Sequence, residues 1–399
     1  MMAAESLWIE GWRTLLFALC GVHLLFVSAF WFGLGRLKRN RAAEQPSVSI
    51  VVPARDEEAL LPRCIESLQR QEDYPADRIE IIVVDDRSTD TTAEIVRQYA
   101  RHDPRVRLVR VDSNPKGYSP KKNAVDQGIA AATGELLFPI DADCEAHPRW
   151  LASMVGCFAP DVAMVSGFAE LDRPNHSERT FIRIQSLELL SLFACAAGST
   201  SIGWILASSG ASQGYRRSTW DQIGGFGEIG PLVSGDDDLM VQRVARLGTG
   251  RIVFAAEPEA RVLTEPMRTV RDFYRQRKRW GSKYTHHRHS YAAFLTLFYT
   301  FNLLLFFSPV LVVLAPGQAL IPWVAALALK WGGELMLLRR AAIAFGRVDL
   351  LRYFPIWALL HVPYITWMGP ASLFGKVVWK GRVHGTRSLM GDEEGRRAA

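Results

Sequence analysis

Hydrophobic residues gather in long apolar runs at the two ends of the chain. Near the N-terminus, residues 14–34 contain no Asp, Glu, Lys or Arg, and about twenty such residues make a helix long enough to cross the hydrocarbon layer of a membrane. A cleaved signal peptide is the alternative, but the run is longer than the apolar part of such a peptide and no small-residue cleavage site follows it. The basic segment GRLKRNR comes next, and basic residues mark the cytoplasmic end of a span. We therefore expect a membrane anchor over 1–40, with the following domain in the cytoplasm.

The last third of the chain contains three further apolar runs, at 292–315, 319–338 and 353–375. The first two have the length of a membrane span, whereas prolines interrupt the third, which is either a span or an interfacial segment. Lys330 and Glu334 lie four residues apart inside the second run, where they either pair with each other or sit near the membrane surface. We expect a C-terminal membrane region of two to three spans over 290–380 and a flexible tail over 381–399.

Between these ends, from about residue 45 to 285, short β-branched runs alternate with segments of helical spacing. The runs SVSIVV, RIEIIVV, VRLVRV and ELLFPI read as strands, whereas LLPRCIESL and TAEIVRQYA have apolar residues at helical intervals. This alternation predicts an α/β domain with a mostly parallel sheet. Ligands of such sheets bind beyond the carboxyl ends of the strands. The polar, acidic and loop residues after these runs are Pro53, Ala54, Glu57, Asp85, Asp86, Asp141 and Asp143.

Composition and charge narrow the function. No glycine-rich phosphate loop follows the first strand, which argues against dinucleotide-dependent redox chemistry and P-loop hydrolysis. The net charge is +6, and the basic residues cluster next to apolar runs, where anionic lipid headgroups are a more common partner than nucleic acid. The five cysteines have no metal or disulfide spacing and read as reduced structural thiols. We expect a membrane-bound protein that binds no nucleic acid.

Asp141 and Asp143 form a D-x-D pair after the run ELLFPI. Most isolated pairs of this kind are solvated turn residues, and this is the first interpretation of the pair taken alone. Carboxylates at a strand end can also hold Mg²⁺ or Mn²⁺, which bridge a protein to the diphosphate of a sugar nucleotide. In that interpretation Asp143 is the direct metal ligand, and Asp141 reaches the metal through water or contacts the ribose.

Six segments occur in the order VVPARDEE, VVDDRSTD, PKKNAV, LFPIDADC, GDDDLMVQRV and QRKRW. This order resembles the membrane-integrated branch of the family 2 glycosyltransferases, which includes cellulose, chitin and hyaluronan synthases and ceramide glucosyltransferase-like enzymes. The resemblance covers roughly residues 47–281. It implies a Rossmann-like GT-A fold flanked by transmembrane helices and a metal-dependent, inverting transfer of a sugar. The implied donor is a nucleotide sugar, a UDP-hexose first of all, and the implied acceptor is a lipid or glycan at the cytoplasmic face of the inner cell membrane.

The first two segments carry the implied nucleotide contacts. By the resemblance, Pro53, Ala54 and Glu57 lie against the nucleotide. Asp85 and Asp86 match the acids that contact the base and the ribose. Asp86 has an alternative role as the N-cap of the helix that follows it.

The third and fifth segments carry the implied charged groups of the reaction. Lys121 matches a contact to the donor diphosphate or base, as a point charge suited to phosphates, and Lys122 is expected in solvent. In GDDDLMVQRV the family pattern aligns best with Asp236 and Asp237, because Arg243 then falls where an arginine is usual. Asp237 is thus the candidate general base, with the register open by one residue. An exposed acidic helix start is the alternative.

The segment QRKRW supplies a Q-x-x-R-W motif as Gln276, Arg279 and Trp280. By the resemblance, these residues form the acceptor and diphosphate region: Trp280 is a floor beneath an acceptor sugar and Arg279 lies near the diphosphate. A membrane-surface amphipathic helix is the other interpretation, and both can hold together.

Four positions depart from the family pattern: Asp56, where Asn is commoner, Arg87 in place of Gly, Ser212 in place of Asn and Gly214 in place of Ala. They leave open the turn geometry at Arg87 and the nature of the acceptor. Two alternatives to a single-transfer enzyme follow. The Q-x-x-R-W motif is also suggestive of a processive polysaccharide synthase, and the departures admit an inactive membrane scaffold of the same fold.

Overall fold

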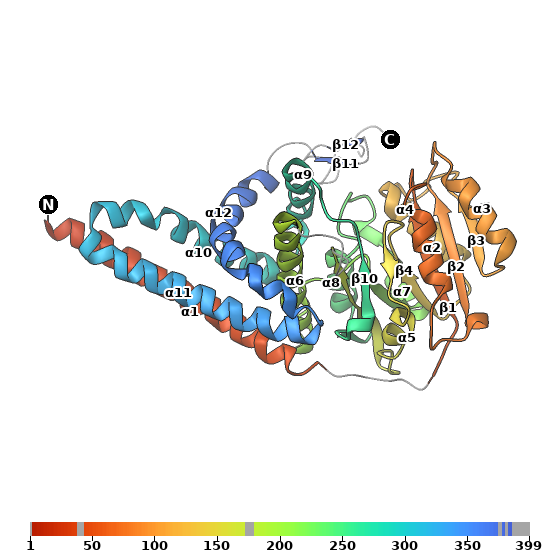
Figure 1. Ribbon diagram of the computed structural model, residues 1–399, viewed down its shortest axis with the longest axis horizontal. Helices are drawn as coiled ribbons and strands as arrows, with labels where there is room; N and C mark the ends of the chain where they lie inside the picture. Colours follow the sequence, from red (N-terminus) through yellow and green to blue (C-terminus); the bar gives the residue numbers. More distant parts are fainter. Residues whose placement is uncertain (1, 38–43, 172–178, 374–376, 380–381, 385–399) are drawn as a thin grey trace.

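A seven-stranded sheet lies in one half of the molecule, and an arm of long helices extends from the other (Figure 1). The computed structural model describes residues 2–37, 44–171, 179–373, 377–379 and 382–384. In spatial order the strands are β3 (Val106–Arg110), β2 (Ile79–Asp85), β1 (Val48–Ala54), β4 (Leu136–Pro139), β8 (Gln213–Arg216), β6 (Val162–Ser166) and β9 (Arg251–Phe254). β8 runs antiparallel to β4 and β6, and the other neighbours are parallel. The expected mostly parallel sheet is confirmed.

Helices cover both faces of this sheet. Ile50 and Val52 of β1 belong to one buried cluster and Val51 to another, because successive side chains of a strand point to opposite faces. Since both faces are buried, the strands read as continuous apolar runs. Helices α2 (Leu61–Gln69), α3 (Thr92–His102) and α5 (Trp150–Val155) contribute to the first cluster, and α4 (Pro120–Ala131), α7 (Arg217–Ile223) and α8 (Asp238–Leu247) to the second.

Smaller elements complete the fold. A three-stranded sheet contains β5 (Glu145–Ala146), β10 (Arg261–Leu263) and β7 (Phe168–Glu170), and a hairpin contains β11 (Val377–Trp379) and β12 (Arg382–His384). The 3₁₀ turns are η1 (Ala76–Arg78), η2 (Gly227–Ile229), η3 (Pro258–Ala260), η4 (Tyr284–His286) and η5 (Val348–Tyr353). Of the expected tail over 381–399, all but 382–384 lies outside the described residues.

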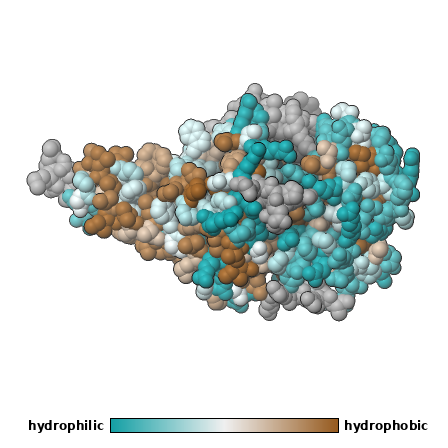
Figure 2. Space-filling model, viewed as in Figure 1, coloured by the Kyte–Doolittle hydropathy of each residue, from teal (hydrophilic) through white to brown (hydrophobic). Residues whose placement is uncertain are grey.

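The arm consists of α1 (Met2–Leu34), α10 (His289–Leu314) and α11 (Pro316–Ala344). Helices α1 and α11 pack along each other, and both contact α10. Apolar residues cover much of the visible face of the arm, whereas the sheet half is mainly polar (Figure 2). Helices α6 (Thr180–Ser201), α9 (Val270–Gly281) and α12 (Phe354–Leu373) lie between the arm and the sheet (Figure 1).

Among the described residues, four helices are long and apolar enough to cross a membrane: Leu7–Leu34, Thr180–Ser201, His289–Leu314 and Pro316–Ala344. Three of them coincide with expected spans. The fourth, α6, was not expected as a span, because it lies within the predicted α/β domain. The proline-interrupted run near the C-terminus forms the continuous helix α12 but is not among the four.

A polar cluster lies inside the arm. Lys330 is fully buried, and its Nζ lies 2.6 Å from Glu334 Oε1 and 3.3 Å from His361 Nδ1. His23 Nε2 lies 3.6 Å from the same Glu334 oxygen. Of the two interpretations that the sequence left open, the structure therefore shows mutual pairing of Lys330 and Glu334, with partners from α1 and α12.

Candidate active site

The D-x-D pair follows β4 at the edge where the parallel strands end. Asp141, Asp143 and Cys144 each place one ligand atom within 4.8 Å of the others. Burial raises the pKa of the Cys144 thiol well above its usual value, which disfavours the thiolate form that binds metals. Asp143 Oδ2 lies 3.5 Å from the Thr264 hydroxyl. The two carboxylates provide the oxygen donors that Mg²⁺ and Mn²⁺ prefer, so the residues present fit such an ion.

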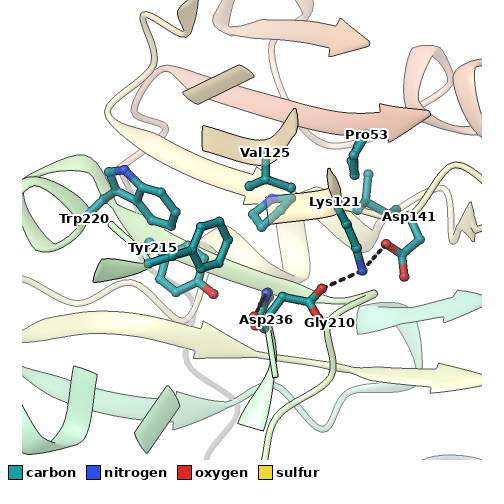
Figure 3. A pocket seen from close by; sticks show the side chains of 12 residues that line it. Pro53, Lys121, Val125, Asp141, Gly210, Tyr215, Trp220 and Asp236 are labelled. Atoms are coloured by element: carbon teal, nitrogen blue, oxygen red, sulfur yellow. Dashed lines mark hydrogen bonds and ion pairs between the residues drawn. The ribbon is translucent and has the colours of Figure 1, made fainter. Parts of the chain in front are cut away.

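Lys121 joins this pair to the acid motif. It lies in the first turn of α4, and its Nζ is 2.6 Å from Asp141 Oδ1 and 2.5 Å from Asp236 Oδ2 (Figure 3). Burial alone would lower the pKa of Lys121, but Asp141 and Asp236 outweigh it and raise the pKa. Three segments that are far apart in the sequence thus meet at one permanently charged ammonium.

A small hollow, open to solvent, lies beside this ammonium. Figure 3 shows its walls, which come from β1, β8, helices α4 and α7, the segment after β4 and the segment before α8. The lining residues include Pro53, Lys121, Asp141, Gly210, Tyr215, Trp220 and Asp236. The Tyr215 hydroxyl is buried and has no hydrogen-bond partner in the described part of the chain. The hollow therefore has charged groups on one side and aromatic rings on the other.

The acid motif begins helix α8. Asp237 is the N-cap, and its Oδ1 accepts hydrogen bonds from the Asp238 amide at 2.7 Å and from Lys283 Nζ at 2.8 Å. Lys283 Nζ also lies 2.8 Å from Asp238 Oδ2. Burial would raise the pKa of Asp236, but Lys121 holds it below its usual range. Burial and then the charge of Asp237 raise the pKa of Asp238 to about 6.

Helix α9 carries the Q-x-x-R-W motif, of which Arg279 faces the acid motif, whereas Gln276 and Trp280 contact Arg277. Burial lowers the pKa of Arg279, and the charges of Asp236 and Asp237 oppose that effect, so this guanidinium interacts with the acid motif. The ring of Trp280 lies 4.1 Å from the guanidinium of Arg277, and the Gln276 side chain accepts a hydrogen bond from Arg277 at 2.5 Å. Arg277 thus contacts two of the three residues of the motif, Gln276 and Trp280.

The predicted nucleotide contacts lie at the ends of β1 and β2. Asp85 and Asp86 are buried, and the Asp86 amide donates to the Ala54 carbonyl at 2.8 Å. The Glu57 amide donates to Thr92 Oγ1 at 2.9 Å. Helix α3 begins at Thr92 with Thr91 as its N-cap, so the capping alternative for Asp86 is wrong. Of these residues, only Pro53 lines the hollow beside Lys121; the others lie farther along the same edge.

Lys122 differs from its expected place in solvent. Its side chain is only 1% exposed, and its Nζ donates to the carbonyls of Ile229, Leu232 and Ser234 at 2.6, 2.8 and 3.0 Å. Burial lowers its pKa to about 8. The expectation failed because the acceptors lie more than 100 residues away. Lys122 fixes the loop that leads to Asp236.

Two family models match the chain. The model described as glycosyl transferase family 2 matches residues 49–192. The model described as glycosyl transferase family group 2 matches residues 137–368, which is more than half of the chain. The chain belongs to glycosyltransferase family group 2.

Relatives of this family group 2 chain share moderate identity. It is 27% identical over 253 residues to the probable glycosyltransferase YdaM of Bacillus subtilis (strain 168), covering 62% of this chain and 57% of YdaM. It is 27% identical over 238 residues to the beta-monoglucosyldiacylglycerol synthase of Synechocystis sp., covering 59% of this chain and 47% of that protein. The chain thus spans about half the length of the curated relatives it matches.

Solved structures support the family's fold. The mannosyltransferase PcManGT from Pyrobaculum calidifontis, solved in complex with GDP-Man and Mn²⁺, superposes with a TM-score of 0.54 at 20% identity. The match covers 91% of this chain and 96% of that one. This likeness concerns the fold, and it confirms the expected GT-A architecture.

Two departures from the family 2 pattern lie in turns. Arg87 has a φ of 57° and Asp56 a φ of 51°, so both adopt the left-handed conformation that Gly and Asn favour. Arg87 forms a two-pronged contact with Asp86 Oδ1 at 2.7 and 3.0 Å. The turn therefore keeps a glycine-like backbone although it carries an arginine.

The other two positions that depart from the family pattern, Ser212 and Gly214, are buried beside the central sheet. A Cβ atom on Gly214 would lie 2.3 Å from the Phe138 ring, so alanine does not fit there. Ser212 is fully buried; its hydroxyl accepts from Trp150 Nε1 at 3.0 Å and donates to the Ala260 carbonyl at 3.3 Å. Both residues fulfil packing requirements of this core.

Proposed function

We propose that this protein is a membrane-integrated glycosyltransferase that transfers a hexose from a nucleotide-sugar donor, a UDP-hexose, to a lipid or glycan acceptor at the cytoplasmic face of the cell membrane. The observation that carries the proposal is the Lys121 bridge, which brings the D-x-D pair and the acid motif to one edge of a GT-A fold. The α/β domain over 45–285 holds the reacting groups. The segments 1–40 and 290–380 hold this domain at the membrane.

The donor site divides into a nucleoside end and a diphosphate end. Pro53, Ala54, Glu57, Asp85 and Asp86 line the nucleoside end. At the diphosphate end Asp143 would hold Mg²⁺ or Mn²⁺, with Asp141 beside it, and the bound ion would neutralise charge on the diphosphate. Lys121 and Arg279 add fixed positive charge where the leaving nucleoside diphosphate becomes more negative.

The reaction is a single displacement with inversion. The acceptor hydroxyl oxygen forms a bond to the anomeric carbon from the face opposite the diphosphate. The bond from that carbon to the diphosphate oxygen breaks, and the electron pair leaves with the nucleoside diphosphate. Asp237 accepts the hydroxyl proton as general base. Trp280 provides an aromatic surface for the acceptor near the end of α9.

A lipid acceptor is supported by two observations. The arm presents an apolar surface of membrane-spanning length, and helices α6, α9 and α12 lie between that arm and the sheet. Several relatives carry the name beta-monoglucosyldiacylglycerol synthase. A transferase with this arrangement would bind its acceptor at the membrane surface, next to the lipid headgroups.

The test is a donor screen with the full chain in lipid nanodiscs. Release of UDP or GDP is measured for UDP-glucose, UDP-galactose, UDP-GlcNAc and GDP-mannose, with Mg²⁺, Mn²⁺ or EDTA and membrane lipid as acceptor. We expect release from a UDP-hexose only with a metal present, and a product carrying one added sugar. A polymer would identify a processive synthase, and absence of binding to any nucleotide would favour the inactive scaffold.

Two variants test the assigned roles. Asp143→Ala removes the metal ligand and Asp237→Asn removes the base; each should lower kcat at least about 100-fold. Lys116→Met, which breaks an exposed ion pair with Asp126, is the matched control and should keep wild-type activity. A folded and active Asp237→Asn variant would refute the assigned mechanism.

A further inference from the structure

Three consecutive acids begin α8, and two lysines face them. The side chains of Asp236, Asp237 and Asp238 are 16%, 28% and 16% exposed. Like charges held so close and so far from water repel each other strongly. Lys121 faces Asp236, and Lys283, whose side chain is 7% exposed, faces the other two. Lys283 belongs to no motif that the sequence singled out.

Lys283 contacts one of the two carboxylate oxygens of Asp237, Oδ1. Oδ1 of Asp237 accepts from the Asp238 amide and from Lys283 Nζ. Oδ2 accepts no hydrogen bond from the described residues and is not buried away from solvent. The carboxylate is therefore held by one oxygen and open at the other, which is the arrangement that a general base requires.

The same lysine joins two elements of the site. Lys283 follows α9 directly, three residues after Trp280, and its Nζ contacts both acids at the start of α8. A shift of α9 would therefore move the ammonium away from Asp237. The contact keeps a fixed relation between the predicted acceptor helix and the predicted base, and geometry of that kind strongly affects transfer rates.

We propose that Lys283 is a positioning residue of the transfer reaction: it fixes the Asp237 carboxylate so that Oδ2 faces the acceptor hydroxyl, and it balances the charge of Asp238. This inference rests on the proposed function. In the proposed function the nucleoside and the metal are held by residues that Lys283 does not contact, so Lys283 acts on turnover and on acceptor use, with little effect on the affinity for the nucleotide.

Other charged and titratable groups surround Lys283 and the acids that it contacts, and they bear on any pH profile. They are Asp236, Asp237 and Asp238 from α8 and the segment before it, Lys121 and Lys122 from α4, Tyr215 from β8, Arg279 from α9, His287 from the segment before α10 and Tyr291 from α10. Burial and the nearby Lys283 lower the pKa of His287 to about 3, so it stays neutral above pH 5. Burial lowers the pKa of Lys122 to about 8, so changes between pH 5 and 7 report mainly on the acids, and changes near pH 8 also report on Lys122.

The test compares Lys283→Met with Lys283→Arg and with Lys116→Met as the matched surface control. Loss of the ammonium should lower kcat about 10- to 100-fold and leave the KM for the donor within about twofold, because only the base is displaced. The acid limb of the kcat profile should move to higher pH, because the acids lose their counter-charge. Lys283→Arg should recover part of kcat, and the control should match wild type.

A double variant separates positioning from charge balance. Lys283→Met combined with Asp238→Asn removes one charge of each sign, so it should fold even where the single variant does not. We expect its kcat to stay at least about tenfold below that of Asp238→Asn alone, because Oδ1 of Asp237 has still lost its lysine. A double variant or a folded Lys283→Met variant with wild-type kcat and pH profile would overturn the proposal. A wild-type chain without transferase activity would instead refute the proposed function.

Discussion

Asp238 is the acid of the motif that changes its charge nearest to neutral pH. Its pKa is raised to about 6 by burial and by Asp237, so it takes up a proton as the pH falls through 6. Among the described residues that Lys283 contacts, Asp237 is then its one ionised partner, and the undivided positive charge makes the predicted base a weaker proton acceptor. We expect kcat/KM to fall about 3- to 10-fold between pH 7 and pH 5. The Asp238→Asn variant should show the lower rate throughout and no change over this range.

The pH dependence of stability distinguishes this loss of activity from acid unfolding. A carboxyl group whose pKa is higher in the folded state binds its proton more tightly there, so this group stabilises the fold increasingly as the pH falls from about 6 towards 4. The acid loss of activity should therefore be reversible, with circular dichroism unchanged. Asp126→Asn, which breaks a surface ion pair, is the control. An Asp238→Asn variant that keeps the wild-type acid limb would contradict this account.

Lys121 and Lys122 are neighbours on α4 with opposite expected roles. Lys122→Met leaves three buried carbonyl acceptors without a donor and should lower the free energy of unfolding by about 1–3 kcal/mol. Lys121→Met removes charge from the diphosphate end of the site, so its distinguishing effect should be a rise of at least about tenfold in the KM for the donor. It should also lower the stability, because Asp141 and Asp236 lose their shared cation. Thermal unfolding in detergent and donor titrations measure both. Interchanged results would show that the two roles are assigned to the wrong lysines.

Some site residues could be predicted from the sequence and others could not, for a physical reason. Asp141, Asp143 and Asp85 follow strand-like runs, so local pattern alone places them at the ligand-binding edge. Lys122 and Lys283 meet partners 107 and 46 residues away, and no local period encodes those contacts. The one signal in the sequence was the run of three acids, Asp236 to Asp238, because adjacent carboxylates in a folded domain require cations nearby.

At the level of elements, helix α9 depends on a buried ion pair. Glu188 of α6 accepts hydrogen bonds from Arg277 at 2.7, 3.1 and 3.2 Å and from the Tyr364 hydroxyl of α12 at 2.7 Å. Arg277 also lies over the rings of Phe273 and Trp280, at 4.6 and 4.1 Å. These contacts hold α6, α9 and α12 together around one buried charge pair.

Neutralising Glu188 should therefore loosen α9. Glu188→Gln keeps the shape of the side chain but leaves Arg277 buried without a counter-ion, and we expect a loss of roughly 2–4 kcal/mol in the free energy of unfolding. Tyr364→Phe should cost about 0.5–1.5 kcal/mol, since it removes one hydrogen bond. Glu94→Gln, in an exposed pair with Arg97, is the matched control. Equal thermal stability of Glu188→Gln and wild type would show that the pair does not hold α9.

The helices also show which elements the pattern of apolar residues could not predict. Apolar runs of sufficient length predicted α1, α10 and α11, but α6 carries Arg183 and Glu188 and lies within the α/β region, so its apolar character was not recognised. A Cβ atom on Gly33 of α1 would lie 2.0 Å from the backbone of Gly198 in α6. Such a close crossing depends on two glycines far apart in the sequence, and it decides how the arm joins the sheet half.

For the whole molecule, the arm and the sheet half have opposite surfaces (Figure 2). Helix α1 has 33 residues and is therefore about 50 Å long, against a hydrocarbon layer of about 30 Å. It is therefore long enough to cross the layer and extend beyond it. In the proposed topology, the Lys121 bridge lies on the side of the membrane where α1 ends.

The orientation of the whole chain can be tested with introduced cysteines. The basic segment after α1 predicts a cytoplasmic sheet half and an external N-terminus. Glu10 in α1 and Ser218 in α7 are exposed, so Glu10→Cys and Ser218→Cys should be tolerated. A membrane-impermeant maleimide should label Cys at 10 in intact cells and Cys at 218 only in inverted vesicles. Because the five native cysteines are buried or partly buried, the unmodified chain is the background control; the reverse labelling pattern would put the donor site outside, away from cytoplasmic nucleotide sugars, and would exclude the proposed reaction in the cell.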